Sequence, residues 1–346
     1  MSEKVKRMSI AAACQGAVLV RMINTCTATG DPMQSAPSRP LLTVEQLERY
    51  YADGFLIVED FFSAPELQPV INEVEAKVEA LAQRLHVAGH IPHTCAGLGF
   101  QERLTALQRL FPGAATLLHI EGILGPALAN LWASPRLLDL MQQVLGGGDV
   151  AGHPVWNLRT KTPLNPLATV PWHQDTAYLA PGVERVLQAT AWIPLVDVDE
   201  SMGTLQVIRG SHRSATVHRH RLERSGNNTA SWYLQIDPSD IPEGDRVVCH
   251  MKKGSFLLLN QLIAHRSTEN TTDRIRWSID LRFQDPALPT GFDAIKPAIT
   301  LRKASDPTYR PDWRGWAGID RVALAGQKRK DPFDAHIDGP WLTRWQ

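Results

Sequence analysis

The chain has 346 residues, of which 43% are hydrophobic, and its 36 basic residues balance 36 acidic ones. This much apolar surface supports a substantial buried core, so the composition excludes a chain that is disordered throughout. A balanced charge gives no net attraction to nucleic acid, and we expect no nucleic-acid partner. No apolar run reaches the roughly 18 residues that cross a bilayer, so we also expect no membrane span.

The four cysteines, Cys14, Cys26, Cys95 and Cys249, are dispersed and form no Cys-x-x-Cys pair. Their spacing argues against a zinc ribbon, a redox motif or a disulfide framework and fits a reducing compartment. We therefore predict a cytoplasmic protein. Residues 1–40 differ from the rest, because they begin with basic residues and continue with small and apolar ones. For this stretch a mitochondrial transit segment, a weak signal peptide and a plain disordered extension stay open.

Helices predominate in the prediction for residues 41–150. Two capping boxes, each a Thr or Ser followed three residues later by Gln or Glu, mark helix starts because the two side chains satisfy otherwise unpaired amides. The predicted elements are, in chain order, a helix from Thr43 to Ala52 ended by Asp53-Gly54, a strand Phe55–Val58, a helix from Ser63 to about Leu85, a loop over 86–104, and two helices between Leu117 and Leu145, the second entered at Ser134-Pro135 and ended by Gly146–Gly148.

Beyond Gly148, short β-rich runs alternate with Pro, Gly and Asn, a spacing typical of an antiparallel sandwich or barrel. The predicted strands are Val155–Thr160, Thr169–His173, Leu187–Pro194, Thr204–Ile208, Val247–Cys249, Ser255–Asn260, His265–Ser267 and Arg276–Phe283. Eight strands favour a jelly roll over residues 151–285, which forms one domain over 41–285 with the helical part. Residues 213–245 are predicted as a polar insertion. Residues 286–346 are predicted as an irregular, Trp-rich tail that wraps the domain or contributes to a homodimer contact.

The tripeptide His173-Gln174-Asp175 places an imidazole and a carboxylate one residue apart. On a β-strand this spacing points both side chains to the same face. Joined by a second histidine from a distant strand, they make the three-ligand set of non-haem Fe(II) oxygenases. His265, shortly after the apolar run Phe256–Leu259, is the candidate for the third ligand.

Other interpretations of these histidines stay open at this point. His173 and Asp175 could form a hydrogen-bonded pair on the surface, and His265 could be a core histidine. His218 and His220 also have strand-like spacing, but they lie in an arginine-rich stretch that we interpret as a solvated insertion. His212 follows Gly-Ser in a predicted turn, so we do not expect it to bind a metal.

Eleven residues after His265, Arg276 begins a strand that we expect to run antiparallel to the strand of His265. A planar guanidinium holds a carboxylate through two parallel charge-assisted hydrogen bonds, which suits the free 5-carboxylate of a 2-oxoglutarate chelated to iron. Arg274 is a competing candidate, because it would share a face with Arg276. Ser267, two residues beyond His265, could donate a further hydrogen bond.

Four blocks occur in order along the chain: His173-Gln-Asp175-x-x-Tyr178, Ala191-Trp192-Ile-Pro-Leu-Val-Asp197, Gly203-Thr-Leu-Gln-Val-Ile-Arg-Gly-Ser-His212 and His265-x-Ser-x-x-Asn-x-x-x-x-x-Arg276. Together they resemble the phytanoyl-CoA dioxygenase family over about residues 43–285. The resemblance implies a double-stranded β-helix with helices packed outside it, and Fe(II) and 2-oxoglutarate as cofactor and cosubstrate. The implied iron ligands, which carry the catalysis, are His173, Asp175 and His265. The implied 2-oxoglutarate contacts are Arg276, Ser267 and Trp192.

The resemblance further implies a dioxygenase that uses O2 to hydroxylate an aliphatic C–H bond of a small organic molecule, releasing succinate and CO2. Related halogenases lack a carboxylate at the position of Asp175, so its presence favours hydroxylation, or another oxidation that follows hydrogen abstraction, over halogenation. Asn157 and Arg159 could line the cosubstrate pocket. Two alternatives stay open: a cupin-like metal- or ligand-binding protein without turnover, and an isomerase or epimerase that uses the same iron centre.

Overall fold

The computed structural model describes residues 41–121, 124–222, 233–292, 296–316, 331–337 and 341–345. The expectations for residues 1–40, and part of those for the insertion and the tail, lie outside the described residues. Among the described residues, no helix has both the length and the apolar character that crossing a membrane requires.

The first helix begins and ends close to where the sequence predicts. Helix α2 (Val44–Asp53) starts at a capping box: the Thr43 hydroxyl accepts from the Gln46 amide N at 3.2 Å, and the Gln46 side chain accepts from the Thr43 amide N at 2.8 Å. Gly54 ends the helix at φ +83°, a left-handed conformation that favours glycine. Strand β1 (Phe55–Val58) follows directly, with the predicted bounds.

Gly54 is also surrounded closely. A Cβ atom at this position would lie 2.4 Å from Nδ1 of His212 and 2.7 Å from Cδ1 of Ile263. We expect Gly54→Ala to lower the free energy of unfolding by about 2–4 kcal/mol, because overpacking adds to the cost of a left-handed alanine. Gly147→Ala is the matched control, since Gly147 has φ +91° but open space around its Cβ. Equal losses for the two variants in urea unfolding would contradict the role of the close contact.

Helix α3 (Ala64–Val87) begins at the second capping box and buries one apolar stripe. The shorter helices that follow are α4 (Arg103–Leu110), α5 (Ala114–Glu121), α6 (Pro126–Trp132) and α7 (Pro135–Val144). The sequence predicts two helices between Leu117 and Leu145, whereas the described residues of this region belong to three, α5, α6 and α7, and it gives no prediction of α4. Pro126 explains one difference, because a proline has no amide N–H to continue a helix and is favoured in the first turn of a new one.

Two antiparallel sheets face each other. Within the described residues, the larger sheet has the strand order β1-β9-β4-β11-β2-β12, with β3 also paired to β11. Its further strands are β2 (Val150–Gly152), β3 (Asn157–Lys161), β4 (Ala189–Pro194), β9 (Phe256–Asn260), β11 (Arg276–Gln284) and β12 (Ile299–Arg302). The smaller sheet has the order β10-β5-β8 and consists of β5 (Leu205–Ile208), β8 (Arg246–Val248) and β10 (His265–Ser267). This arrangement confirms the predicted double-stranded β-helix with helices outside it.

The predicted strand over residues 169–173 is wrong. Only His173 pairs there, through an isolated antiparallel bridge to His265. Pro171 has no amide N–H to donate to a ladder, which explains why the pairing does not extend. The strands that carry His265 and Arg276, which we expect to run antiparallel to each other, do not pair directly. They lie in different sheets, since β10 pairs with β5 while β11 pairs with β2, β3 and β4.

The insertion and the tail contain more regular structure than the sequence predicts. In the insertion, β6 (His220–Leu222) and β7 (Leu234–Ile236) form a two-stranded sheet. In the tail, β12 pairs with β2 at the edge of the larger sheet, and a short helix α9 (Trp341–Arg344) follows near the end. Both were missed because their strands and helix are only three or four residues long, too short for a periodic pattern.

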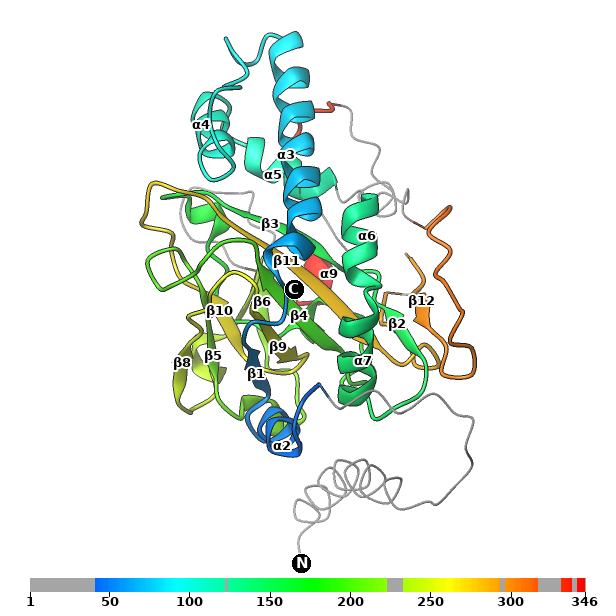
Figure 1. Cartoon of the computed structure of the whole chain (residues 1–346). Helices are drawn as coiled ribbons and strands as arrows, with labels where there is room; N and C mark the ends of the chain where they lie inside the picture. Colours follow the sequence, from blue (N-terminus) through cyan, green and yellow to red (C-terminus); the bar gives the residue numbers. More distant parts are fainter. Residues whose placement is uncertain are drawn as a thin grey trace, which may run out of the picture.

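Alternate side chains of β11 point to opposite faces of the larger sheet. Its side chains Trp277, Ile279, Leu281 and Phe283 join the core that helices α3, α6 and α7 build against the larger sheet (Figure 1). The alternate residues Arg276, Ser278, Asp280 and Arg282 point to the opposite face, into the space between the two sheets. The barrel interior therefore receives a row of polar and charged side chains from one strand.

Candidate metal centre

His173 and His265 meet across their antiparallel bridge, each donating its amide N–H to the other's carbonyl O, at 2.9 and 3.0 Å. Their ring centroids are 4.1 Å apart. Nδ1 of His173 lies 2.8 Å from the carbonyl O of Pro171, and Nδ1 of His265 lies 3.0 Å from the carbonyl O of Ile263. Because a carbonyl only accepts hydrogen bonds, we assign the ring proton of each histidine to its Nδ1 atom. Both Nε2 atoms then keep a lone pair for a metal ion.

Asp175 reaches these imidazoles from a turn and not from a strand. It is the first residue of a 3-10 helix, η3 (Asp175–Tyr178), so the expectation that it shares a strand face with His173 is wrong. Gln174 holds the turn by donating from Nε2 to the carbonyls of Thr216 at 3.0 Å and Leu262 at 2.8 Å. The turn brings Oδ1 of Asp175 to 3.8 Å from Nε2 of His173.

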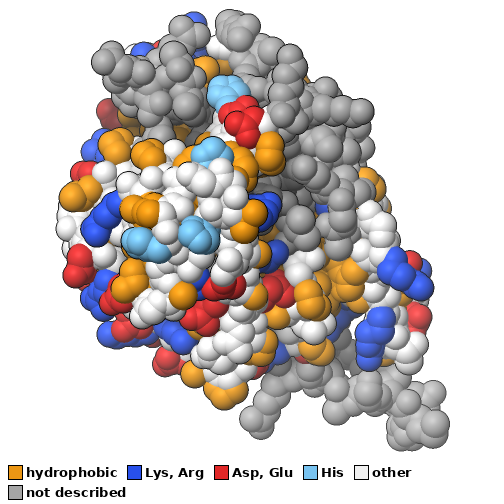
Figure 2. Space-filling view, turned by 90° about the horizontal axis from the view of Figure 1, so that it is seen from above, with side chains coloured by type: hydrophobic (Ala, Val, Ile, Leu, Met, Phe, Trp, Pro, Cys, Tyr) orange, Lys and Arg blue, Asp and Glu red, His pale blue; other side chains and the backbone are white. Residues whose placement is uncertain are grey.

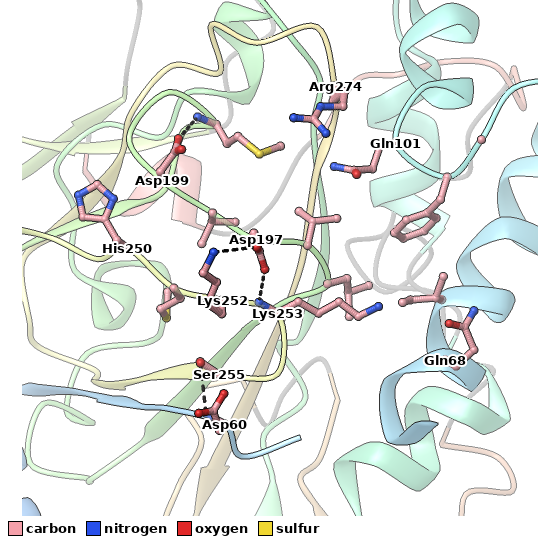
Figure 3. A pocket seen from close by; sticks show the side chains of 18 of the residues that line it. Asp60, Gln68, Gln101, Asp197, Asp199, His250, Lys252, Lys253, Ser255 and Arg274 are labelled. Carbon is pink, nitrogen blue, oxygen red and sulfur yellow. Dashed lines mark hydrogen bonds and ion pairs between the residues drawn. The ribbon is translucent and has the colours of Figure 1, made fainter. Parts of the chain in front are cut away.

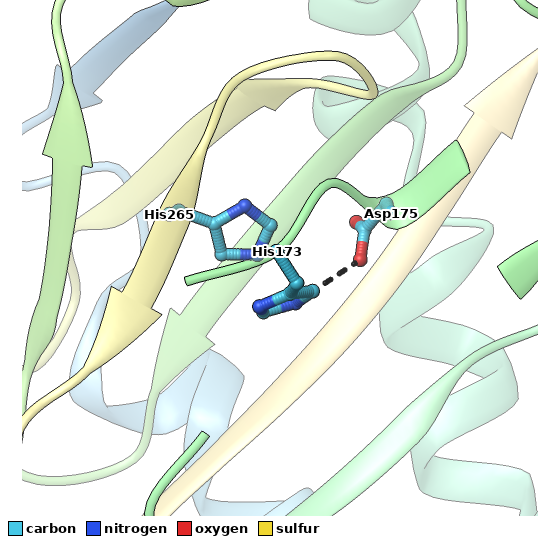
Figure 4. Close-up of side chains that lie close together, drawn as sticks. All are labelled: His173, Asp175 and His265. Atoms are coloured by element: carbon cyan, nitrogen blue, oxygen red, sulfur yellow. Dashed lines mark ion pairs between the residues drawn. The ribbon is translucent and has the colours of Figure 1, made fainter. Parts of the chain in front are cut away.

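The three side chains form a buried cluster. One ligand atom from each of His173, Asp175 and His265 lies within 4.8 Å of the other two (Figure 4). Burial, with the neighbouring His265, lowers the pKa of His173 well below its usual range, so this imidazole is neutral at physiological pH. Two neutral imidazoles and one carboxylate are the donor set of the two-histidine, one-carboxylate Fe(II) sites, which leave coordination positions open. The residues therefore fit an iron ion.

Arg282 holds the carboxylate of Asp175. Its Nη2 lies 2.9 Å from Oδ1 and its Nε 3.3 Å from Oδ2, while Nη1 donates to the carbonyl of Val155 at 2.7 Å. Burial alone would raise the pKa of Asp175, but the charge and hydrogen bonds of Arg282 outweigh it and hold the pKa well below its usual range. Asp175 is therefore ionised and oriented before any metal binds.

Removing Arg282 would leave that buried carboxylate without its cation. We expect Arg282→Met to lower the free energy of unfolding of the metal-free protein by about 3–5 kcal/mol, the usual cost of breaking a buried ion pair. Urea unfolding measures the loss, and Arg246→Met, at an exposed arginine of β8, is the control. A loss below about 1 kcal/mol would contradict this role.

His173, Asp175 and His265 line a pocket inside the barrel, and Arg276, the first residue of β11, lines the same pocket. Its side chain is buried, with the guanidinium carbon 5.1 Å from the centroid of the Trp192 ring. Nε and Nη1 have no hydrogen-bond partner within the part of the chain that the structure describes. Burial lowers the pKa of Arg276 to about 10, so it stays charged at neutral pH. A buried cation with unused donors is costly unless an anion pairs with it, which fits an anionic ligand in this pocket.

Ser267 lies beside Arg276 in the wall of this pocket. Its Oγ accepts from Lys161 Nζ at 2.9 Å and from the Val170 amide N at 3.0 Å. Because both lone pairs of the hydroxyl are used, its proton is free to be donated into the pocket. Lys161 is opposite Arg276 in the β3–β11 register, and burial, followed by this arginine, lowers the pKa of Lys161 well below its usual range.

Sequence reasoning missed several polar residues of this interior, among them Lys161, Asp280 and Arg282. Asp280 accepts from Asn157 Nδ2 at 3.1 Å and from Arg159 Nε at 2.7 Å. Arg159 lines the pocket of the triad, as expected, and Asn157 supports the wall by its bond to Asp280. The available signal was the alternation of polar residues along β3 and β11.

Arg274, the competing candidate for the anion contact, lies elsewhere. It is exposed and lines a groove of about 1170 Å³ that also contains Gln101 and Lys253 and includes none of the three candidate ligands (Figure 3). Arg276, one pleat further along the chain, is the arginine that faces the triad. Arg274 lies in a bend before β11, so the alternation of that strand does not place it on the face of Arg276.

The remaining histidines of interest have structural partners. Nδ1 of His218 lies 3.4 Å from Asp240, and Nε2 of His220 accepts from the Gln174 amide N at 3.2 Å. His212 contacts the carbonyl O of Tyr51 through Nε2 at 3.0 Å. Among the described residues, the only group of His, Cys, Asp and Glu side chains close enough to share a metal ion is the triad.

Acidic, basic and apolar side chains of the described residues are interspersed on the face that Figure 2 shows. This mixture agrees with the equal numbers of acidic and basic residues in the chain.

Comparison with known families identifies the chain. Residues 50–278, more than half of the sequence, match the model of the phytanoyl-CoA dioxygenase (PhyH) family. The chain belongs to this family. Its members are Fe(II)- and 2-oxoglutarate-dependent oxygenases, and this member has the complete His-Asp-His triad.

Curated relatives of this PhyH-family chain include hydroxylases of small molecules. It is 25% identical over 181 residues to 1-deoxypentalenic acid 11-beta-hydroxylase of Streptomyces arenae, a match over 49% of this chain and 60% of that protein. It is 26% identical to ectoine dioxygenase of Bordetella parapertussis, over 75% of this chain and 87% of that protein. The fold resembles that of the non-heme monooxygenase ThoJ, with a TM-score of 0.54 and 23% identity over 81% of this chain and 95% of that structure.

Proposed function

We propose that this chain catalyses the Fe(II)- and 2-oxoglutarate-dependent hydroxylation of an aliphatic C–H bond in a small organic molecule, with succinate and CO2 as co-products. One observation carries the proposal. The triad and the unpaired guanidinium nitrogens of Arg276 line one buried pocket, so a metal site and a site for a carboxylate occur together.

The residues of the pocket would have two roles, to bind iron and to bind 2-oxoglutarate. The Nε2 atoms of His173 and His265 and the carboxylate of Asp175 would hold the iron, and Arg276 and Ser267 would bind the distal carboxylate of 2-oxoglutarate. Iron, when bound, supplies the activation of O2 by which 2-oxoglutarate is decarboxylated and the substrate oxidised.

The chain itself excludes water and fixes orientation. The apolar side chains Val170, Leu205 and Leu259 line the pocket together with Trp192, which lies beneath the Arg276 guanidinium. A buried, partly apolar lining strengthens each electrostatic contact inside the pocket. The carboxylate of Asp175 supports hydroxylation over halogenation, because it fills the position where a halide would need to bind.

Succinate formation tests the proposed reaction. Iron-loaded wild-type protein with 2-oxoglutarate in air should release succinate slowly without substrate and faster with one. A metabolite screen scored by this release would then find the substrate. If the iron-loaded protein binds 2-oxoglutarate but forms no succinate with any compound, a binding protein without turnover is the better description.

A further inference from the structure

The end of the chain packs against the turn that carries Asp175. Nη1 of Arg344 donates to three carbonyls in and just after this turn, those of Thr176 at 3.2 Å, Ala177 at 3.3 Å and Leu179. Trp345 donates from Nε1 to the Ala177 carbonyl at 3.0 Å. These contacts join residues more than 160 positions apart in the sequence.

Aromatic contacts extend the same interface. The Trp341 ring lies 5.8 Å from the Tyr178 ring between centroids, and Tyr178 lies 5.9 Å from the ring of His173. The ring of Trp345 lies 5.2 Å from that of His220, whose Nε2 accepts from the amide that precedes Asp175. The clamp residues, as we call Trp341, Arg344 and Trp345, therefore contact η3 and its immediate neighbours.

The turn needs such support. A 3-10 helix of four residues has few internal hydrogen bonds, here from the Ala177 amide to the Gln174 carbonyl and from the Leu179 amide to the Thr176 carbonyl. Its last carbonyls have no partner within the helix, and they carry the negative end of its dipole. The Arg344 guanidinium, a cation with several N–H donors, lies at that end. It supplies hydrogen bonds to carbonyls there, and its positive charge compensates the negative end of the dipole.

We propose that the C-terminal clamp positions Asp175 for metal binding. Arg282 fixes the carboxylate of Asp175, while Arg344 and Trp345 fix the backbone from which that side chain projects. Arg344 is thus a positioning residue, which acts on the metal through the turn. The proposal rests on the proposed role of Asp175 as a metal ligand.

Two measurements on purified, metal-free protein test the clamp. Isothermal titration with Ni(II) gives the metal affinity, and hydrogen exchange reports the amides of residues 175–179. For Arg344→Ala we expect about 10-fold weaker Ni(II) binding, the lower end of what loss of an outer-shell partner costs, together with faster exchange in this segment. Trp345→Phe keeps an aromatic ring but removes the indole N–H and its hydrogen bond, so we expect a loss of about 2- to 5-fold.

Arg314→Ala is the matched control, because Arg314 lies in the same tail but is almost fully exposed and, among the described residues, pairs with Asp312 alone. It should match the wild type in both measurements. Ni(II) affinity within 2-fold of wild type in Arg344→Ala, with or without faster exchange, overturns the proposal. If Arg344→Ala does not fold, Trp345→Phe and Arg344→Lys decide by the same criterion. A wild-type protein that binds no Ni(II) overturns the metal centre itself, which separates that failure from failure of the clamp.

Discussion

His173→Ala should abolish specific metal binding in the barrel. The substitution removes one of only three protein ligands, so we expect Ni(II) affinity to fall by more than about 100-fold, beyond the about 10- to 100-fold cost of outer-shell changes. The fold should persist, because the backbone bridge from residue 173 to His265 does not use the imidazole. Isothermal titration and circular dichroism measure the two effects.

His250→Ala is the control for this experiment. His250 is exposed and lines the groove of Figure 3, away from the triad. Its variant should bind Ni(II) as the wild type does. Unchanged affinity in His173→Ala would show that the metal binds elsewhere, and the assignment of the triad would then be wrong.

Arg276→Ala should weaken 2-oxoglutarate binding by about 100-fold. Two charge-assisted hydrogen bonds at about 1.5 kcal/mol each amount to about 3 kcal/mol, or roughly two powers of ten in affinity. The KM for 2-oxoglutarate in succinate formation measures this effect, while metal affinity should change little. Arg276→Lys should recover only part of the loss, because a lysine keeps the charge but not the planar fork.

Arg274→Ala provides the matched comparison, since the two arginines are two residues apart and only one faces the triad. We expect its KM for 2-oxoglutarate to equal that of the wild type. The opposite pattern, with Arg274→Ala impaired and Arg276→Ala normal, would reverse the assignment.

The sequence pattern predicted which residues form the triad, but it did not predict their geometry. His173, Asp175 and His265 come together as expected, yet Asp175 does so from a 3-10 turn. A two-residue spacing is compatible with several backbone conformations, and only tertiary contacts, such as those of Gln174 with Leu262, select one. The spacing alone therefore could not give the conformation of the turn.

The supporting residues were largely beyond sequence reasoning. Arg282 pairs with Asp175 across 107 positions, and Arg344 reaches the same turn from the end of the chain. Such contacts leave no local pattern, since each partner is ordinary in its own segment. The role of Lys161 could not be predicted from the sequence either. A lysine at the end of a strand is usually solvated, and its burial follows only from the pairing of β3 with β11.

The absorption spectrum of the anaerobic complex tests the central claim most directly. Addition of Fe(II) and then 2-oxoglutarate to the wild-type protein should produce a weak visible metal-to-ligand charge-transfer band. The band should be absent in His173→Ala and weakened in Arg276→Ala at equal 2-oxoglutarate concentration. A wild-type protein that is fully loaded with Fe(II) yet shows no band at saturating 2-oxoglutarate would contradict an iron and 2-oxoglutarate site in this barrel.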